Sequence, residues 1–313
     1  MLACAGLNAA TVVTIIDDDT ESVAAVSAVR AIAENNGVKA TFAAIARNVE
    51  KNPALAAQLL DCQSAGHEIA SHSYSHSPLV WSRRQRHPGQ VAEMERDIIR
   101  AHAVLTNLGF RISAFVYPYG NFKGREYRSS VLAMTAAHYP AAFNSRGGDN
   151  RKDGTHFLYV GRFPMRSHNS PVMVGRFLRA AARKGDGWLV LMTHGGKSGF
   201  SAKDLEAAIR ECKDSGCVFA TASEAVKMLR DRGWRSIAAD DTDESTPFDE
   251  LCDFAEFHLP VVAVAALALA LLLAASVTFF RVARARPSRT ARTHWRQDAP
   301  SSPTGGRGAQ RTS

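Results

Sequence analysis

The chain lacks the features of a small disulfide-stabilised, fibrous or disordered protein. Its 313 residues include only five cysteines, which form neither a C-x-x-C pair nor repeated metal-site pairs. Hydrophobic residues make up 46% and charged residues 22%, a composition that predicts a globular domain with a sizeable core and some additional segments. Cys212 and Cys217 flank a turn-like Lys-Asp-Ser-Gly segment, which fits a disulfide and two ordinary residues at a helix end equally well.

The chain also lacks a basic helix or patch, although 38 Lys and Arg outnumber 30 Asp and Glu. The charges are segregated along the sequence instead. Residues 239–258 hold eight acidic residues and no Lys or Arg, whereas residues 281–313 hold eight arginines and Asp298 as the single acidic residue. We therefore predict no nucleic-acid partner.

No charged residue occurs in residues 259–280, a run of 22 that would span roughly 33 Å as a helix. A buried core helix is the alternative, but such a helix rarely lacks every charged side chain over this length. The run predicts a single transmembrane helix. The positive-inside rule then places residues 281–313 in the cytoplasm and the catalytic domain outside the membrane.

These patterns predict the organisation of the whole chain. Residues 1–10 have no basic segment and too short an apolar stretch for a complete export signal. Either they are the remnant of a signal that starts upstream, or the transmembrane helix itself directs export. The predicted parts are this remnant (1–10), a folded domain (11–238), an acidic linker (239–258), a transmembrane helix (259–280) and an arginine-rich tail (281–313).

Within the folded domain, short apolar runs alternate with helical patterns, and no shorter internal repeat is present. We expect strands over residues 11–16, 40–45, 67–71, 113–118, 141–145, 157–163, 188–194 and 218–222. We expect helices over residues 22–36, 52–65, 90–108, 125–138, 172–184 and 202–214, followed by a last helix. This alternation predicts an α/β fold in which about seven parallel strands form a barrel.

Polar side chains follow several of the predicted strands. Asp17, Asp18 and Asp19 follow the first strand. His72 and His76 follow the third, and Tyr119 and His194 follow later strands. Because the carboxyl ends of parallel strands meet at one rim, we expect these residues to gather there. Adjacent carboxylates repel without a cation, and two histidines spaced H-x3-H with a carboxylate are a recurrent zinc arrangement, so the pattern predicts a metal site.

Four segments carry a resemblance to a known family. They are IIDDDT (15–20), SHSYSH (71–76), FVYPYG (115–120) and LMTH (191–194). In this order and rough spacing they resemble the motifs of the polysaccharide deacetylase (NodB homology) family, carbohydrate esterase family 4, over about residues 11–235. The resemblance implies a deformed, incomplete (β/α) barrel that removes acetyl groups from sugars with a divalent metal, most often zinc, with cobalt, manganese or nickel as alternatives.

The resemblance also implies roles for the residues of the first two motifs. Asp17 matches the general base and Asp18 the metal ligand beside it, while His72 and His76 match the two histidine ligands. Asp19 stands where the family usually has glycine, and aspartate tolerates unusual backbone angles better than most residues do.

The last two motifs imply the remaining roles. Tyr119 matches the residue whose backbone N–H helps hold the oxyanion, although simple packing would also explain it. Val116 stands where the family has an arginine that pairs with the base, and Arg162 is our candidate for supplying that charge. His194 matches the catalytic acid, with a structural histidine as the alternative, and Leu191 matches the residue that lines the acetyl methyl pocket.

The implied function is a metal-dependent hydrolase that removes acetyl groups from N-acetylated or O-acetylated cell-envelope carbohydrate, either polysaccharide or peptidoglycan. The missing arginine at Val116 leaves open a catalytically inactive, membrane-anchored glycan-binding protein on the same fold. A third reading keeps the chemistry but has a non-sugar amide as the substrate.

Overall fold

The computed structural model describes residues 10–77, 89–120, 125–145, 148–165 and 171–237, in which strands alternate with helices. The strands are β1 (Val12–Asp17), β2 (Thr41–Ala44), β3 (Glu68–Ser71), β4 (Ile112–Val116), β5 (Ala142–Phe143), β6 (Asp149–Arg151), β7 (Phe163–Pro164), β8 (Gly187–Thr193) and β9 (Val218–Phe219). The helices are α1 (Val23–Asn35), α2 (Ala46–Lys51), α3 (Pro53–Ser64), α4 (Gln90–Asn107), η1 (Pro118–Gly120, a 3-10 turn), α5 (Arg125–Ala136), α6 (Pro171–Lys184), α7 (Ala202–Asp214) and α8 (Ala222–Asp231). The predicted alternation is confirmed except at residues 157–163, where the only strand residue is Phe163 of the two-residue β7. The sequence pattern also does not predict the short elements α2 and β6.

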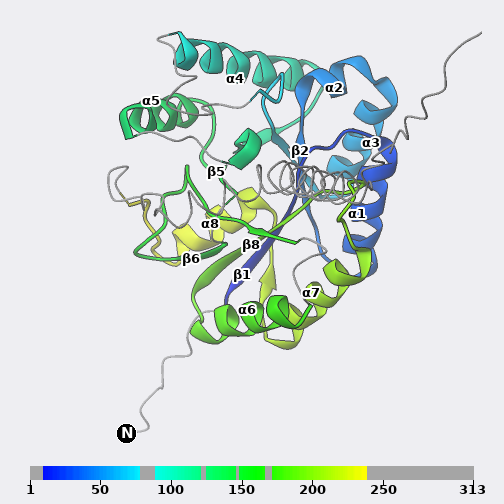
Figure 1. Ribbon diagram of the computed structural model, residues 1–313, viewed down its shortest axis with the longest axis vertical. Coiled ribbons are helices and arrows are strands. Elements are labelled where there is room, and N and C mark those ends of the chain that lie inside the picture. Colours follow the sequence, from blue (N-terminus) through cyan, green and yellow to red (C-terminus); the bar gives the residue numbers. More distant parts are fainter. Residues whose placement is uncertain (1–9, 78–88, 121–124, 146–147, 166–170, 238–313) are drawn as a thin grey trace, which may run out of the picture. The chain divides into compact units, whose positions relative to one another are not determined.

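The strands form one curled sheet in the order β5-β4-β3-β2-β1-β8-β6, with β7 also paired to β8 and β9 to β1. Strands β1 and β8 are parallel neighbours, with Val12 opposite Trp188 and Asp17 opposite Thr193. Figure 1 shows these two strands crossing the middle of the domain. Their carboxyl ends therefore lie side by side, and the residues that follow them are brought together.

The predicted sheet needs two corrections. Among the described residues it has nine strands rather than about seven, and it is mixed, because β6 pairs with β8 in the antiparallel sense. A deformed, incomplete barrel nevertheless describes the sheet well.

The predicted transmembrane helix is not upheld, since no helix in the part of the chain that the structure describes is both long and apolar enough to span a bilayer. These helices bury one face and expose polar residues on the other, as α4 does with Glu93 and Glu95. Residues 259–280 lie outside the described residues, as do residues 1–9, the linker and the tail, and the predicted domain boundaries stay predictions.

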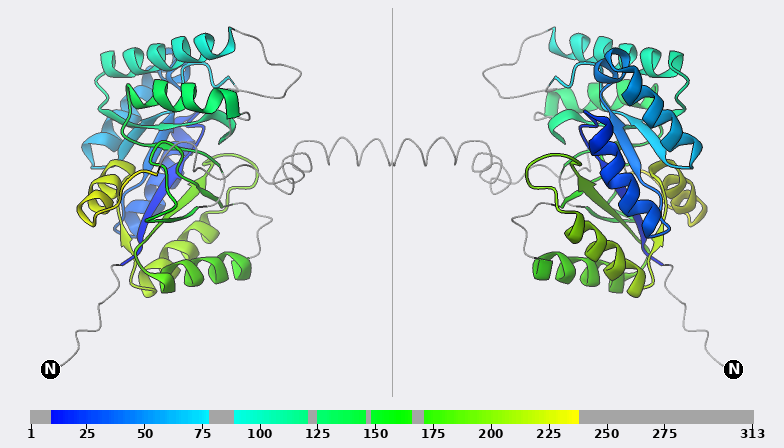
Figure 2. Two further views of the ribbon diagram at one scale, coloured as in Figure 1. Left: turned by 90° about the vertical axis from the view of Figure 1, so that its left-hand side faces the viewer. Right: turned by 90° about the vertical axis from the view of Figure 1, so that its right-hand side faces the viewer.

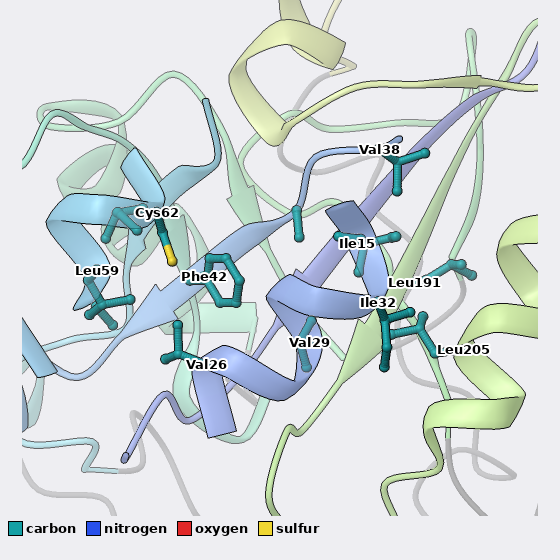
Figure 3. Close-up of a cluster of buried hydrophobic side chains, with 14 of the residues drawn as sticks. Ile15, Val26, Val29, Ile32, Val38, Phe42, Leu59, Cys62, Leu191 and Leu205 are labelled. Carbon is teal, nitrogen blue, oxygen red and sulfur yellow. The ribbon is translucent and has the colours of Figure 1, made fainter. Parts of the chain in front are cut away.

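The core lies on both faces of the sheet, because successive side chains of a strand point to opposite sides. Val13 and Ile15 of β1 pack in a cluster with buried residues of α1, α3 and α7, which Figure 3 shows around Ile15 and Leu191. Val12 and Ile16 pack on the other side with residues of α8 and with Trp188. Trp188 is fully buried and donates its indole N–H to Thr14, so it is a packing residue of the core.

Two further features complete the domain. Helices α4 and α5 lie together along one edge, as both views in Figure 2 show, and bury a third cluster that includes Phe115 and Tyr139. Cys212 and Cys217, at the end of α7, are free thiols in the structure.

Glu68 at the start of β3 gives the fold a testable pH dependence. It is 8% exposed, accepts hydrogen bonds from the Ser113 hydroxyl and the Ser223 N–H, and its burial raises its pKa despite these bonds. The folded protein therefore holds this proton more tightly than the unfolded chain. We expect the free energy of unfolding to fall as pH rises from the usual glutamate pKa through the raised one. Glu68→Gln should flatten this slope in urea titrations at a series of pH values, and an unchanged slope would contradict the assignment.

Candidate metal and catalytic site

The polar residues that follow the strands meet at the carboxyl rim of the sheet. Asp19, His72 and His76 lie closest together, with one potential ligand atom of each within 4.8 Å of the others. Asp19 Oδ1 is 3.1 Å from His72 Nε2 and 2.9 Å from His76 Nε2. Burial alone would raise the pKa of Asp19, but the neighbouring side chains of His72 and His76 hold the pKa below its usual range. Asp19 is therefore a carboxylate that faces two histidine nitrogens.

The orientation of His72 is set by the neighbouring strand. Its Nδ1 is 2.8 Å from the carbonyl oxygen of Val116 at the end of β4. A carbonyl only accepts, so Nδ1 carries the proton and Nε2 presents its lone pair toward Asp19 and His76. Backbone hydrogen bonding of this kind is how metal-ligating histidines are held in one tautomer. The sequence gives no sign of this support.

The loop that carries His76 is held by α4. Asp97 accepts hydrogen bonds from the backbone N–H groups of Tyr74, at 3.0 Å, and Ser75, at 3.1 Å. The Ser73 hydroxyl in turn accepts from the N–H of His76. The alternating charges of α4 suggest a solvated face, but Asp97 has this specific role in fixing the histidine loop.

Asp97→Ala should lower metal affinity without removing a ligand. Two backbone donors near His76 would lose their acceptor and the loop would move more freely, so we expect a drop of about 10- to 100-fold, the range measured for groups that support metal ligands. Isothermal titration of the metal-free protein with zinc measures the affinity. Glu95→Ala, an exposed position on the same helix, is the matched control and should leave it unchanged. Equal affinities for the two variants would show that Asp97 does not support the site.

Four residues at this rim have a strained, left-handed backbone conformation. Asp19, Ser73, His76 and Tyr119 all have φ values between 51° and 61°, a region that residues other than glycine rarely adopt. Such strain persists only where the surroundings hold it and gathers at functional sites. The left-handed backbone turns Asp19 and His76 toward each other.

Asp18 lies beside this cluster and has a different partner. The guanidinium of Arg162 donates from its terminal nitrogen to Asp18 Oδ1, and its Nε donates to the carbonyl of Asn144 at 2.6 Å. Arg162 is fully buried and Asp18 is 5% exposed, so the ion pair is shielded from water. Arg162 therefore supplies a buried positive charge to a motif aspartate even though Val116 occupies the position two residues before Pro118.

Asp17 points away from the cluster. It is the last residue of β1 and continues the alternation of Val13 and Ile15 toward the face covered by α1. Its Oδ1 accepts hydrogen bonds of 2.7 Å from the Thr193 hydroxyl and from the N–H of Gly195. Burial raises the pKa of Asp17 to about 7, and these hydrogen bonds oppose the rise.

His194 and Tyr119 flank the Asp19 cluster. His194 Nε2 is 4.0 Å from Asp19 Oδ2, and burial lowers the pKa of His194 although Asp18 and Asp19 counteract this. The ring of Tyr119 packs on that of His76 at 4.8 Å between centroids, and 45% of Tyr119 is exposed. Gly120 allows the turn, because a Cβ there would meet the side chain of Ser145 at 2.0 Å.

The structure thus brings together most of the sequence-predicted site residues but arranges them differently. Those at the rim are Asp18, His72, His76, Tyr119, Arg162 and His194. Leu191 is fully buried in the cluster with Ile15 and Leu205, on the side of the sheet that α1 and α7 cover. Asp17 lies on that side too. The sequence analysis did not place Asp19 with the two histidines. The signal was available, because the apolar run that begins at Val12 extends as a strand to Asp17, so the first aspartate is the last residue of the strand.

The donor set fits a divalent metal. Two imidazole nitrogens and one carboxylate oxygen are the protein ligands typical of catalytic zinc sites. The lone pair of His72 Nε2 faces the other two donors, as a ligand requires.

Comparisons with known proteins agree with this reading. Residues 6–137 match the family model described as polysaccharide deacetylase. One similar structure is the carbohydrate esterase family 4 domain of a multidomain xylanase from the hindgut metagenome of Trinervitermes trinervoides, with 20% identity, a TM-score of 0.52 and coverage of 73% of this chain and 94% of that one. A Streptococcus mutans esterase of the same family has 16% identity, a TM-score of 0.52 and coverage of 68% and 87%. A pseudoenzyme of that family from Bacillus anthracis has 15% identity, a TM-score of 0.50 and coverage of 70% and 66%.

At these identities the solved structures establish the shared fold, and no curated protein matches the chain. The family match is more specific, because residues 6–137 include Asp18, Asp19, both histidines of the cluster and Tyr119. This match and the shared fold support the resemblance of residues 11–235 to the polysaccharide deacetylase family.

Proposed function

We propose that the chain is an active, metal-dependent deacetylase of acetylated carbohydrate in which Asp19, His72 and His76 hold the metal and Asp18 is the general base. One observation carries this proposal. The three ligand atoms converge within 4.8 Å, directly beside a buried Asp18–Arg162 ion pair and His194. The aspartate roles are thereby moved one residue along the chain from those that the family resemblance implies, in which Asp17 is the base and Asp18 the ligand.

Asp19, His72 and His76 would hold a divalent ion, for which zinc is our first choice, and its charge would polarise the acetyl carbonyl and activate a water molecule. Asp18 takes the proton from this water as it attacks the carbonyl carbon. Arg162 holds the Asp18 carboxylate in one orientation. Because Asp18 pairs with Arg162 and Asp19 faces the two histidines, we assign the base to Asp18 and the ligand to Asp19.

The remaining residues act on the tetrahedral intermediate. The backbone N–H of Tyr119 donates a hydrogen bond to the oxyanion, which forms only as the reaction proceeds. His194 then donates a proton to the leaving nitrogen or oxygen as the bond to the acetyl group breaks. The lowered pKa of His194 makes it a more ready proton donor once it is charged. The products are acetate and the free amine or hydroxyl of the sugar.

The substrate class follows from the family and from what its similar structures are named for. We propose an N-acetylated or O-acetylated polysaccharide, including peptidoglycan, as the substrate. The extracytoplasmic location of the domain stays a prediction from the sequence.

The test is acetate release by the full chain from acetylated chitooligosaccharides, acetylated xylan and peptidoglycan fragments, with zinc, with cobalt and with a chelator. We expect release that the chelator abolishes and added metal restores. His76→Ala should remove both bound metal and activity, whereas His138→Ala, which lies away from the rim, should change neither. Bound metal without acetate from any of these substrates would favour the inactive glycan-binding alternative.

A further inference from the structure

We infer that Asp17 is a positioning residue that fixes the loop of the proposed catalytic acid, His194. The inference rests on the proposed function for the role of His194, but its structural part stands on hydrogen bonds. Asp17 contacts the residues on both sides of His194: the hydroxyl of Thr193 and the N–H of Gly195 both donate to Asp17 Oδ1 at 2.7 Å. One carboxylate oxygen thus holds the two chain neighbours of the acid.

The geometry excludes a direct role for this carboxylate at the metal. Asp17 is fully buried, and its side chain continues the face of β1 that packs against α1. A Cβ placed on Gly195 would lie 2.7 Å from the carbonyl oxygen of Ala25 in α1 and 3.2 Å from Asp17 Oδ2. The Asp17 carboxylate therefore lies between the His194 loop and α1, on the opposite side of the strand from Trp188.

The backbone supports the same loop at a second point. The N–H of Asp18 donates to the carbonyl of Thr193 at 2.8 Å, which extends the pairing of β1 and β8 by one residue. Thr193 is thus held by its backbone and by its hydroxyl, and Gly195 by its N–H. His194, between two fixed neighbours, has its backbone position determined by Asp17 and its side chain directed to the rim, 4.0 Å from Asp19.

The identity of the residues at these positions is chemically specific. A carboxylate oxygen can accept two strong hydrogen bonds at once, and hydrogen bonds to a charged acceptor are about twice as strong as neutral ones. Glycine at 195 is required for the close approach to α1. Acid catalysis depends on the reacting groups being placed within a fraction of an ångström, and a misplacement of 1 Å can cost about 100-fold in rate.

The test uses Thr193→Val, which keeps the side-chain shape but removes the hydroxyl donor to Asp17. In the full chain with zinc, we expect kcat to fall about 10- to 100-fold, while KM and zinc affinity change by less than about twofold. Thr193→Ser restores the hydroxyl and should recover most of the rate. Thr135→Val is the matched control, because Thr135 is equally buried and its hydroxyl is also hydrogen-bonded, but away from the rim.

A second measurement is independent of turnover. In protein labelled with ¹³C-histidine, the His194 ring signal, assigned by its loss in His194→Ala, should shift and broaden in Thr193→Val and return in Thr193→Ser. The signals of His72 and His76 should stay in place. If the wild-type chain releases no acetate, the proposed function fails, yet this spectrum still decides the positioning role. An unchanged His194 signal, or a loss of rate that Thr135→Val reproduces, would overturn the inference.

Discussion

Asp18→Asn should reduce kcat of the full chain by about 10² to 10⁴-fold, the range typical of the loss of a general base. Asparagine has the size of aspartate but cannot take up the proton of the attacking water. Metal binding should persist, because the ligand atoms come from Asp19, His72 and His76. Zinc stoichiometry and kcat measured on the same preparation check both parts of this expectation.

Asp17→Asn is the comparison that separates the two assignments of the aspartates. Asparagine can still accept the hydrogen bonds from Thr193 and Gly195, only more weakly, so we expect about a tenth of the wild-type rate or more to remain. If Asp17 were the base, this variant would be the inactive one and Asp18→Asn would lose its metal. An inactive Asp17→Asn that still binds zinc, together with an Asp18→Asn that has lost its zinc, would therefore reverse our assignment.

The two assignments of the aspartates differ by one residue, because they differ in which aspartate is taken as the last residue of β1. The order of strands and helices follows from apolar runs and helical periodicity, and the meeting of the polar residues at one rim follows from parallel strands. Which of three consecutive aspartates faces which side depends on where β1 ends, and the alternation of side chains decides this. Counting every second residue from Val13 places Asp17 on the face of β1 that α1 covers. The direction of the Asp17 side chain could therefore have been predicted from the sequence.

Other parts of the site had no local signal. Arg162 and Asp18 are 144 residues apart in sequence, and their pairing depends on the folded sheet. The support of His72 by a carbonyl of β4, and of the His76 loop by Asp97 of α4, likewise joins segments that only tertiary structure brings together. The antiparallel strand β6 is three residues long and has too short a pattern to detect.

Arg162→Met should destabilise the metal-free protein by about 3–5 kcal/mol, because it leaves Asp18 as a buried charge without its partner. Asp18→Asn leaves the opposite charge unpaired and should also destabilise. The two changes together remove both charges, so the double variant should lose about 1–3 kcal/mol less than the sum of the single losses.

This coupling shows whether the pair holds Asp18 in place, which the proposed base requires. Urea unfolding in the presence of a chelator gives the four free energies without a contribution from bound metal. Arg179→Met, which breaks the partly exposed ion pair with Glu211, is the matched control and should cost about 1 kcal/mol or less. Should Arg162→Met not fold, Arg162→Lys completes the cycle, because lysine keeps the charge but cannot reach both Asp18 and the Asn144 carbonyl. Losses that simply add would mean that Arg162 stabilises the fold without holding Asp18, and the base would need another means of orientation.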